Sequence, residues 1–469
     1  MNNCEIKILP GMKFHFIGVG GIGMSGLAQM LVTAGCIVSG SDRGLAQPEN
    51  KTIFAPLSNQ GIELFAQDGS YCQTSTPDYI IYSTAIEADN PDFMAAPAIP
   101  RIHRSTALAA AMQLPNTGKM IAVSGSCGKT TVTAWLAETL SRANSATGLL
   151  TGGLVNLFRT SNSAGNYHQG NGELFVFEAD ESDKSLLAYE PEYALLLNIG
   201  TDHYEKDELV RVFSEFVRHI KLGLVVEQSV YKMLEPGCAD HLVVKTFSTT
   251  DPDCDWFMSD YQSSPAGIKV GINHQLTIEL PMPGIHNAAN ALAIIAMLDL
   301  LNKPLAKLLP QIGKFSGVWR RNDYAGKTQS GARVYDDYAH NVEKIVASFS
   351  ALRQTISGRL IIIFQPHGFG PLGFMRNELF KVLEINLRDD DIFAMLPPFY
   401  AGGTTSFKPT SQAVIEQYRL TGTKNYQYFA ERLNAENYLD KHAGANDAII
   451  IMGARDNSLS TWAAELVKK

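Results

Sequence analysis

The chain has 469 residues, of which 45% are hydrophobic and 18% are charged, and its formal net charge at pH 7 is -8. This length exceeds what one hydrophobic core usually supports, so we expect about three domains of an ordinary globular protein. The acidic balance, without runs of Lys and Arg, excludes a general nucleic-acid binder.

The start of the chain and its cysteines indicate a cytoplasmic protein. Residues 1–10 lack the apolar segment of a secretory signal, and no apolar run is long enough to span a membrane. The six cysteines are scattered without paired spacing, which favours reduced thiols. We therefore expect a soluble cytoplasmic protein with no membrane partner, as a monomer or a homodimer.

A nucleotide-binding fingerprint opens the chain. The glycine-rich segment 18–23 lies between a predicted strand, 13–19, and a predicted helix, 24–34, and fits the pattern G-x-G-x-x-G. Asp42 follows the next apolar run, about where such folds bind a ribose. We expect this region to hold the diphosphate of a nucleotide, with a nicotinamide-dependent oxidoreductase as a rival interpretation. Further short strands are predicted near 79–82 and 99, before a turn-rich linker at 114–119.

A second phosphate loop, Gly125–Thr131, follows the apolar run Met120–Val123 and precedes the helical pattern Val132–Leu140. Backbone N–H groups of such a loop and the positive end of the helix dipole favour anionic oxygens. Lys129 is expected to reach the outer phosphates, and the Thr130 hydroxyl is expected to bind Mg²⁺. The expected phosphate contacts are Gly125, Ser126, Cys127, Gly128, Lys129, Thr130 and Thr131.

The thiol inside this loop gives a further hypothesis. A cysteine near a helix N-terminus can be reactive, so alkylation of Cys127 is expected to inactivate the protein and ATP to protect it. An unreactive, packed cysteine is the alternative.

Polar residues follow two continuous apolar runs of the middle region. Glu178–Asp183 comes directly after Leu174–Phe177, and Thr201–His203 comes after Ala194–Asn198. Such runs are typical of buried parallel strands, whose carboxyl ends face the crevice where ligands bind. Hard oxygen ligands suit Mg²⁺, so these residues predict a metal site, with a solvated acidic loop as the alternative.

The last third of the chain shows the same kind of pattern. A helix is predicted at 288–301, after the motif 284–287, and strands are predicted at 334–338, 360–364, 391–396 and 448–452. The polar groups of 336–341 and 365–367 stand at the ends of two of these strands. We therefore expect a third domain that presents polar groups along one edge of its sheet.

These motifs, in this order, resemble the Mur ligase family over essentially the whole chain. Residues Phe14–Gly26, Ser39–Asp42 and Glu178–Asp183 are most similar to the branch that joins L-alanine to UDP-N-acetylmuramate. The resemblance implies an α/β protein of three domains. They are a Rossmann-like UDP-sugar-binding domain (1–115), a central P-loop ATPase domain with a parallel sheet (116–317) and a Rossmann-like C-terminal domain that closes over ATP and the amino acid (318–469).

The resemblance also implies roles for individual residues. The catalytic set would be Lys129, Glu178, His203, His340 and His367, with Thr130, Glu178 and His203 at the metal. Besides the loop, ATP would contact His286, Asn287, Asn290, Arg320, Arg321 and Asp337. The UDP-sugar would contact Gly20, Gly21, Ile22, Gly23, Ser41, Asp42, Ser83, Thr84, His103 and Arg104, while Tyr338 and His367 would face the amino acid.

The implied reaction consumes ATP, with Mg²⁺, to convert the muramate carboxylate into an acyl phosphate, which a small amino acid, L-alanine, then attacks. Ser126–Cys127 stands where the family commonly has Thr-His or Thr-Asn, and Asn341–Val342 stands where its alanine branch has His-Pro. After His367 the family has an arginine-containing loop that touches substrate; here we expect an altered loop, 368–375, with an arginine only later, at Arg376. Two alternatives therefore stay open: a recycling ligase for muramyl tripeptide, and a non-catalytic nucleotide-binding paralogue.

Overall fold

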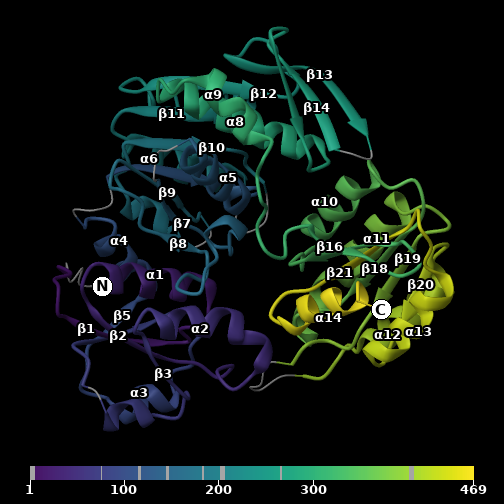
Figure 1. Ribbon diagram of the computed structural model, residues 1–469, viewed down its shortest axis with the longest axis horizontal. Helices are drawn as coiled ribbons and strands as arrows, with labels where there is room; N and C mark the ends of the chain where they lie inside the picture. Colours follow the sequence, from purple (N-terminus) through teal and green to yellow (C-terminus); the bar gives the residue numbers. More distant parts are fainter. Residues whose placement is uncertain are drawn as a thin grey trace. The chain divides into compact units, whose positions relative to one another are not determined.

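The computed structural model describes residues 6–74, 76–114, 118–143, 147–181, 184–200, 206–264, 267–400 and 406–468. The chain forms two compact units (Figure 1). The first comprises Met1–Tyr261, Lys269–Leu280 and His286–Val318, and the second comprises Gln262–Ile268, Pro281–Ile285 and Trp319–Lys469. The first unit contains two sheets and the second contains one. The domain limits at 115 and 317 stay predictions.

The first sheet has the strand order β3-β2-β1-β4-β5, and all its neighbours pair in parallel. Its strands are β1 (Lys13–Ile17), β2 (Ile37–Ser41), β3 (Glu63–Phe65), β4 (Tyr79–Tyr82) and β5 (Arg101–His103). Its helices are α1 (Ile22–Thr33), α2 (Lys51–Asn59), α3 (Pro91–Ala95) and α4 (Arg104–Ala111). The predicted strand, glycine loop and helix at the start of the chain are confirmed by β1 and α1.

The second sheet has ten strands in the order β15-β14-β13-β12-β11-β10-β6-β9-β7-β8. They are β6 (Lys119–Ser124), β7 (Gly148–Leu150), β8 (Tyr167–His168), β9 (Leu174–Glu178), β10 (Tyr193–Leu196), β11 (Gly223–Glu227), β12 (Val243–Ser248), β13 (Trp256–Ser264), β14 (Gly267–Ile272) and β15 (Leu276–Leu280). The helices of this part are α5 (Lys129–Arg142), α6 (Lys206–Arg218), α7 (Gln228–Tyr231), α8 (Ile285–Leu300) and α9 (Leu305–Ile312). β6 pairs in parallel with β9 and β10, so the carboxyl ends of all three lie at one edge.

Two features of this sheet differ from the sequence-based expectation. The sheet is not wholly parallel, because β7 and β8 pair antiparallel. The strands β11 to β15 were also missing from the prediction. Asn273 and His274 adopt positive φ angles of 51° and 57° between β14 and β15, so a turn without glycine separates two short strands.

The sheet of the second unit has the order β16-β17-β21-β18-β19-β20, with antiparallel pairing at β16–β17 and parallel pairing elsewhere. The strands are β16 (Asp323–Lys327), β17 (Arg333–Asp337), β18 (Leu360–Phe364), β19 (Ile392–Met395), β20 (Asn425–Tyr428) and β21 (Ala448–Met452). The helices are α10 (Val342–Arg353), α11 (Phe369–Asn386), α12 (Ser411–Thr421), α13 (Arg432–His442) and α14 (Ser458–Leu466).

Both faces of this sheet are covered, which explains the continuous apolar runs. Leu360, Ile362 and Phe364 of β18 belong to the core beneath α10, α11 and α12. Ile361 and Ile363 belong to the core beneath α13 and α14. Alternate side chains of one strand thus fill two cores, as in doubly wound folds. Among the helices of the described residues, none is long and apolar enough to cross a membrane.

Candidate active site

The phosphate loop lies between β6 and α5, as predicted, and two of its glycines are required by the backbone. Gly125 has φ 136° and Gly128 has φ 89°, angles that residues with a side chain rarely adopt. A Cβ atom on Gly128 would lie 3.1 Å from Asn290 Oδ1, and one on Gly125 would lie 3.0 Å from the Asn198 nitrogen. The loop is therefore packed closely against the ends of α8 and β10.

Asn198 holds the shape of the loop and was not predicted as a site residue. Its Oδ1 accepts from the Cys127 N–H at 2.8 Å, and its Nδ2 donates to the Cys127 carbonyl at 2.9 Å. The Ser126 hydroxyl accepts from the Gly200 N–H at 2.7 Å. The Cys127 side chain is exposed, so the alternative of a packed cysteine is wrong, while its reactivity stays a prediction. Asn198 closes the apolar run 194–198, and this position was the only signal for it in the sequence.

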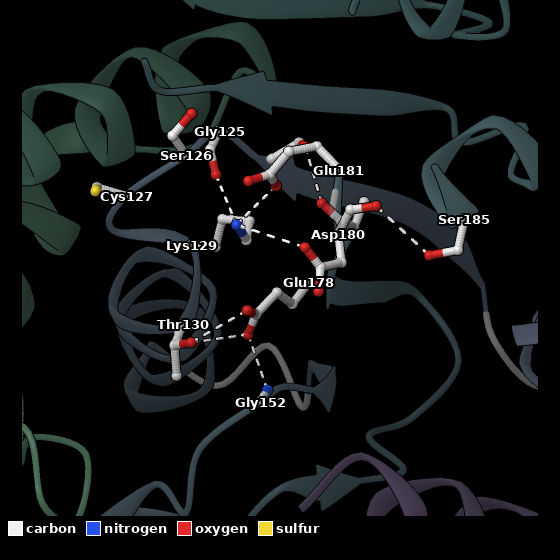
Figure 2. Close-up of polar contacts among 12 residues, drawn as sticks. Gly125, Ser126, Cys127, Lys129, Thr130, Gly152, Glu178, Asp180, Glu181 and Ser185 are labelled. Carbon is white, nitrogen blue, oxygen red and sulfur yellow. Dashed lines mark hydrogen bonds and ion pairs between the residues drawn. The ribbon is translucent and has the colours of Figure 1, made fainter. Parts of the chain in front are cut away.

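Lys129 is surrounded by acceptors at the start of α5 (Figure 2). Its ammonium donates to the Gly125 carbonyl at 2.8 Å and to Glu181 Oε2 at 2.7 Å, and Asp180 Oδ1 lies 3.7 Å away. Burial disfavours the charge on Lys129, but the Glu181 and Asp180 carboxylates outweigh it and raise the pKa of the ammonium. Lys129 is therefore a cation at neutral pH, held by a Glu181 side chain that is 2% exposed.

Glu178 lies at the end of β9, where three donors fix its carboxylate; Figure 2 shows the contacts from Thr130 and Gly152. The Thr130 hydroxyl lies 3.1 and 3.0 Å from its two oxygens. The Thr151 hydroxyl and the Gly152 N–H donate to Oε2 at 3.2 and 2.8 Å. The structure thus brings together two of the three predicted metal ligands, whereas His203 lies outside the described residues.

A hydroxyl and a carboxylate on one edge fit Mg²⁺. This ion keeps several waters and takes one or two protein carboxylates together with substrate phosphates. A complete protein cage would need more ligands. Within the described ranges, no group of three or more His, Cys, Asp and Glu is arranged to hold a metal.

Three of the predicted ATP contacts lie in the first turns of α8. Asn287 and Asn290 on α8 are 8% and 9% exposed, and Asn290 is the residue packed against Gly128. His286 precedes them on the same helix with an exposed side chain. Of these three predicted ATP contacts, Asn290 is the one that the structure places directly against the phosphate loop.

The glycine loop of the first sheet is held by Asp42. The Gly20 N–H donates to Asp42 Oδ2 at 2.9 Å, and the Gly44 N–H donates to Oδ1 at 2.7 Å. Arg104 lies against the same loop, because a Cβ atom on Gly23 would come within 3.2 Å of its Nη1. Asp42, Arg104 and the glycines are therefore gathered at the carboxyl ends of β1 and β2.

Other predicted sugar-nucleotide contacts are placed differently. The Ser41 side chain is fully buried and donates to the Asp92 carboxylate. His103 Nδ1 accepts from the Ser105 N–H at 3.3 Å and caps α4. Ser83 and Thr84 follow β4, with half-buried and exposed side chains. Ser41 and His103 thus have structural partners within the first sheet and its helices.

In the second unit, the two predicted arginines have different surroundings. Arg320 is 1% exposed; its guanidinium donates to Asp336 Oδ1 at 3.2 Å and to the carbonyls of Gly453 and Asp456 at 2.5 and 3.1 Å. Arg321 is partly exposed, and its guanidinium carbon lies 5.8 Å from the centre of the Tyr338 ring. The Arg320 guanidinium thus makes its hydrogen bonds within the second unit, and Arg321 is the more accessible of the two arginines.

Two histidines meet at the carboxyl ends of β17 and β18. The rings of His340 and His367 are 5.0 Å apart at 80°, and His340 Nδ1 lies 3.0 Å from the Tyr338 carbonyl. Burial lowers the pKa of His340 to about 4 and also lowers the pKa of His367. Both imidazoles are therefore neutral at pH 7, and they confirm the expected polar edge of this sheet.

Asp337 is the last residue of β17 and lies at the same polar edge of the sheet. Its carboxylate accepts from the Asn322 N–H at 2.6 Å and from the Ala339 N–H at 2.7 Å. Burial raises its pKa, while Arg321 opposes the shift. The side chain is 5% exposed, and its two hydrogen bonds shape the turn around Tyr338. Asp337 also stands where a nucleotide contact is expected from the sequence.

The residues after His367 form a helix, not the loop expected from the sequence. α11 begins at Phe369, directly after Gly368, which has φ 155°. Phe369 packs on Phe407, whose ring also contacts Tyr400. An aromatic cluster and the first turns of a helix therefore occupy the sequence position of the family's arginine-containing loop.

Comparison with known proteins agrees with this arrangement. Family models match in chain order: "Mur ligase family, catalytic domain" at residues 13–114, "Mur ligase middle domain" at 123–298 and "Mur ligase, glutamate ligase domain" at 320–455. The UDP-N-acetylmuramate--L-alanine ligase of Allorhizobium ampelinum is 31% identical over 96% of this chain and 95% of its own length. That of Desulforamulus reducens is also 31% identical, over 97% of both chains.

Solved structures show the same similarity. The UDP-N-acetylmuramate-alanine ligase of Thermotoga maritima superposes with a TM-score of 0.78 at 26% identity, covering 97% of this chain and 98% of that chain. A murein peptide ligase of Psychrobacter arcticus shares the fold, with a TM-score of 0.69 at 23% identity, over 97% and 99%. The predicted α/β organisation in three parts is confirmed, and the chain belongs to the Mur ligase family.

Proposed function

We propose that the protein is an ATP-dependent ligase that joins L-alanine to UDP-N-acetylmuramate. The similarity to ligases of that name extends over nearly the full length of both chains. The observation that carries the proposal is the phosphate loop itself, in which a cationic Lys129 and the Thr130–Glu178 pair lie at adjacent strand ends. This arrangement supports phosphoryl transfer rather than hydride transfer, so the oxidoreductase interpretation is not retained.

The chemistry explains why ATP is needed. A carboxylate is anionic and has no good leaving group, so an amine does not attack it at a useful rate. Transfer of the γ-phosphoryl group to the muramate carboxylate gives an acyl phosphate, and the amine then displaces phosphate to form an amide. Lys129 and the loop N–H groups would offset the charge that the transferring group carries.

Mg²⁺ would be held by the Thr130 hydroxyl and the Glu178 carboxylate, where it would neutralise phosphate charge. The Thr151 hydroxyl and the Gly152 N–H would keep Glu178 oriented, because both donate to its Oε2, while the Thr130 hydroxyl lies within 3.1 Å of both carboxylate oxygens. For the second unit, we propose that Tyr338 and His367 contact the amino acid and that the neutral His340 orients His367.

The main alternative within the family is the attachment of a muramyl tripeptide to the same sugar nucleotide. The specific observation behind it is the start of α11 at Phe369 with its aromatic partners Tyr400 and Phe407. A surface without arginines at 368–375, with Arg376 further along α11, would contact a different amine substrate from that of the alanine ligases.

The test is the release of phosphate from ATP in the presence of Mg²⁺ and UDP-N-acetylmuramate. L-alanine, glycine, L-serine and the muramyl tripeptide are supplied one at a time. We expect turnover with L-alanine. Turnover confined to the tripeptide would assign the recycling reaction, and no amine-dependent ADP formation with any of the four would reject a ligase and favour the non-catalytic paralogue.

Lys129→Ala is the first variant to compare. We expect a loss of turnover on the order of 10³-fold, because no other cation replaces the ammonium at the transferring group. Lys119→Ala is the matched control, since Lys119 is exposed at the opposite end of β6. Equal turnover of the two variants would remove the phosphate loop from the mechanism.

A further inference from the structure

A buried polar network joins α1 to the second sheet, and Asn166 is at its centre. The Asn166 Nδ2 donates to the Ile22 carbonyl at 2.6 Å and to the Ser25 hydroxyl at 2.8 Å. Its Oδ1 accepts from Gln29 Nε2 at 2.8 Å. Asn166, Ser25 and Gln29 are all 0% exposed. Ile22 is the first residue of α1 and follows Gly21, so this network holds the end of the sugar-nucleotide loop.

The same residue is connected to the phosphate site on its other side. The Thr151 N–H donates to the main-chain carbonyl of Asn166 at 2.9 Å. The Thr151 hydroxyl and the neighbouring Gly152 N–H then donate to Glu178 Oε2. Glu178 accepts in turn from Thr130 on α5. A continuous series therefore runs from the Ile22 carbonyl to the Asn166 side chain, from the Asn166 main-chain carbonyl to the Thr151 N–H, and from the Thr151 hydroxyl through Glu178 to the helix that begins at Lys129.

The contact is buried and tightly packed, which limits its freedom to adjust. A Cβ atom on Gly26 of α1 would lie 2.8 Å from Leu150 Cδ1 and 3.3 Å from Asn166 Nδ2, so α1 approaches β7 closely. An amide whose donors and acceptor are all engaged in a buried site has one favourable orientation. A shift of the α1 N-terminus therefore moves Asn166, and Asn166 moves Thr151.

We propose that Asn166 is a positioning residue that couples the sugar-nucleotide loop to Glu178 in the phosphate site. The inference rests on the proposed function, because it takes UDP-N-acetylmuramate and ATP as the two ligands. A ligand that orders the Gly20–Gly23 loop and the first turn of α1 fixes the Ile22 carbonyl, and the network carries this restraint to the Glu178 carboxylate. By linkage, each ligand then raises the affinity of the other by the same factor.

The experiment measures this factor directly. The dissociation constant of a non-hydrolysable ATP analogue with Mg²⁺ is determined by calorimetry, with and without saturating UDP-N-acetylmuramate. We expect the sugar nucleotide to tighten analogue binding about fivefold or more in the unaltered protein, the lower range of typical couplings. In Asn166→Ala the ratio is expected to fall close to one, whereas a purely structural role would weaken both affinities and leave their ratio unchanged.

Further variants keep the test decisive if Asn166→Ala folds poorly. Thr151→Val removes the hydroxyl that reaches Glu178 and should also lower the ratio, while Thr151→Ser keeps the hydroxyl and should restore it. Asn59→Ala is the matched control: Asn59 Nδ2 donates to the Ser161 carbonyl at 2.7 Å, outside the series leading to Glu178, so the ratio should be kept.

Two results separate the inference from the function on which it rests. A ratio of one in the unaltered protein, or an unchanged ratio in Thr151→Val, overturns the coupling role while both ligands still bind. Failure of UDP-N-acetylmuramate or of the ATP analogue to bind the unaltered protein overturns the proposed function itself, and the coupling role with it.

Discussion

The ammonium of Lys129 has a partner that a nucleotide must displace. Glu181 is buried 2.7 Å away, so an incoming phosphate competes with a carboxylate for the same charge. Glu181→Gln removes both this competitor and its repulsion of phosphate. We expect MgADP to bind about tenfold more tightly to the variant, which corresponds to roughly 1.4 kcal/mol.

Titration calorimetry measures this change, and Asp180→Asn is the control. Asp180 lies 3.7 Å from Lys129 and is 42% exposed, so solvent screens it and its substitution should have a smaller effect. Weaker binding of MgADP to Glu181→Gln would show instead that Glu181 mainly holds Lys129 in place.

His340 makes the stability of the second unit depend on pH. The unfolded chain takes up a proton on this imidazole near pH 6.5, whereas the folded protein does so near pH 4. Unfolding therefore binds a proton between these values, and stability is lost as the pH falls from about 6.5 to about 4. For this one group, the loss between pH 7 and pH 5 is about 2 kcal/mol.

Urea unfolding at pH 7 and pH 5 checks this value by comparison with His340→Asn. The variant should lose about 2 kcal/mol less than the unaltered protein over this interval. The same pH dependence in both proteins would mean that His340 is protonated in the folded state at pH 5.

Among single residues, the sequence predicted those site residues that stand near the ends of strands. Lys129 and Thr130 begin α5 after the short loop that follows β6, and Glu178 ends the neighbouring β9, so their positions along the chain predict that they meet. Glu181 was predicted within the acidic cluster 178–183, but not as the partner of Lys129, and Asn198 and Asn166 were not predicted as site residues. Which side chain of a loop turns inward depends on the path of that loop in space, and no periodic pattern records it.

α5 connects the phosphate loop to the end of the first unit. Glu138 in its middle is 0% exposed and accepts from the Ser316 N–H at 2.9 Å and the Ser316 hydroxyl at 2.7 Å, as well as from Arg142 at 2.8 Å. The Trp135 indole donates to the Ile312 carbonyl at 2.8 Å. The helix that begins at Lys129 thus also anchors the segment that ends this unit at Val318.

Glu138→Ala should therefore destabilise the first unit. The substitution leaves the two donors of Ser316 without their acceptor in a buried site, and we expect a loss of about 3 kcal/mol in the free energy of unfolding. Glu138→Gln keeps one acceptor oxygen, so its free energy of unfolding should lie between those of the alanine variant and the unaltered protein. Chemical denaturation measures both, and a change below about 0.5 kcal/mol for the alanine variant would contradict this role.

Elements with long apolar runs were the most predictable part of the fold, although the short buried strand β11 was missed. β9, β18 and β21 are buried on both faces, so their sequences are continuous in apolar residues and unmistakable. β13 and β15 carry exposed and half-buried residues, and their weaker pattern gave no prediction. α11 was missed at its start because the glycines and proline of 368–373 suggest a loop.

For the whole molecule, the two compact units predict two unfolding transitions. The first unit has two sheets, the second has one, and each unit has its own buried core, so calorimetry of the full chain should resolve two heat-absorption peaks. Leu379→Ala in the core of the second unit creates a cavity that costs about 2–5 kcal/mol. It should lower the temperature of one peak and leave the other in place.

Leu292→Ala is the reciprocal variant, since Leu292 is fully buried on α8 in the first unit. It should move the other peak. A single peak that shifts as a whole with either substitution would show that the units unfold together and that the division of the chain has no thermodynamic counterpart.

The pairing of Lys129 with Glu181 also bears on how a product leaves. As ADP departs, the Glu181 carboxylate, 2.7 Å from the Lys129 ammonium, pairs with it again, so no unpaired cation remains in this site. The barrier to dissociation is lowered, and the residence time of the spent nucleotide is shortened. A side chain that weakens binding can therefore raise the turnover number wherever product release limits the rate.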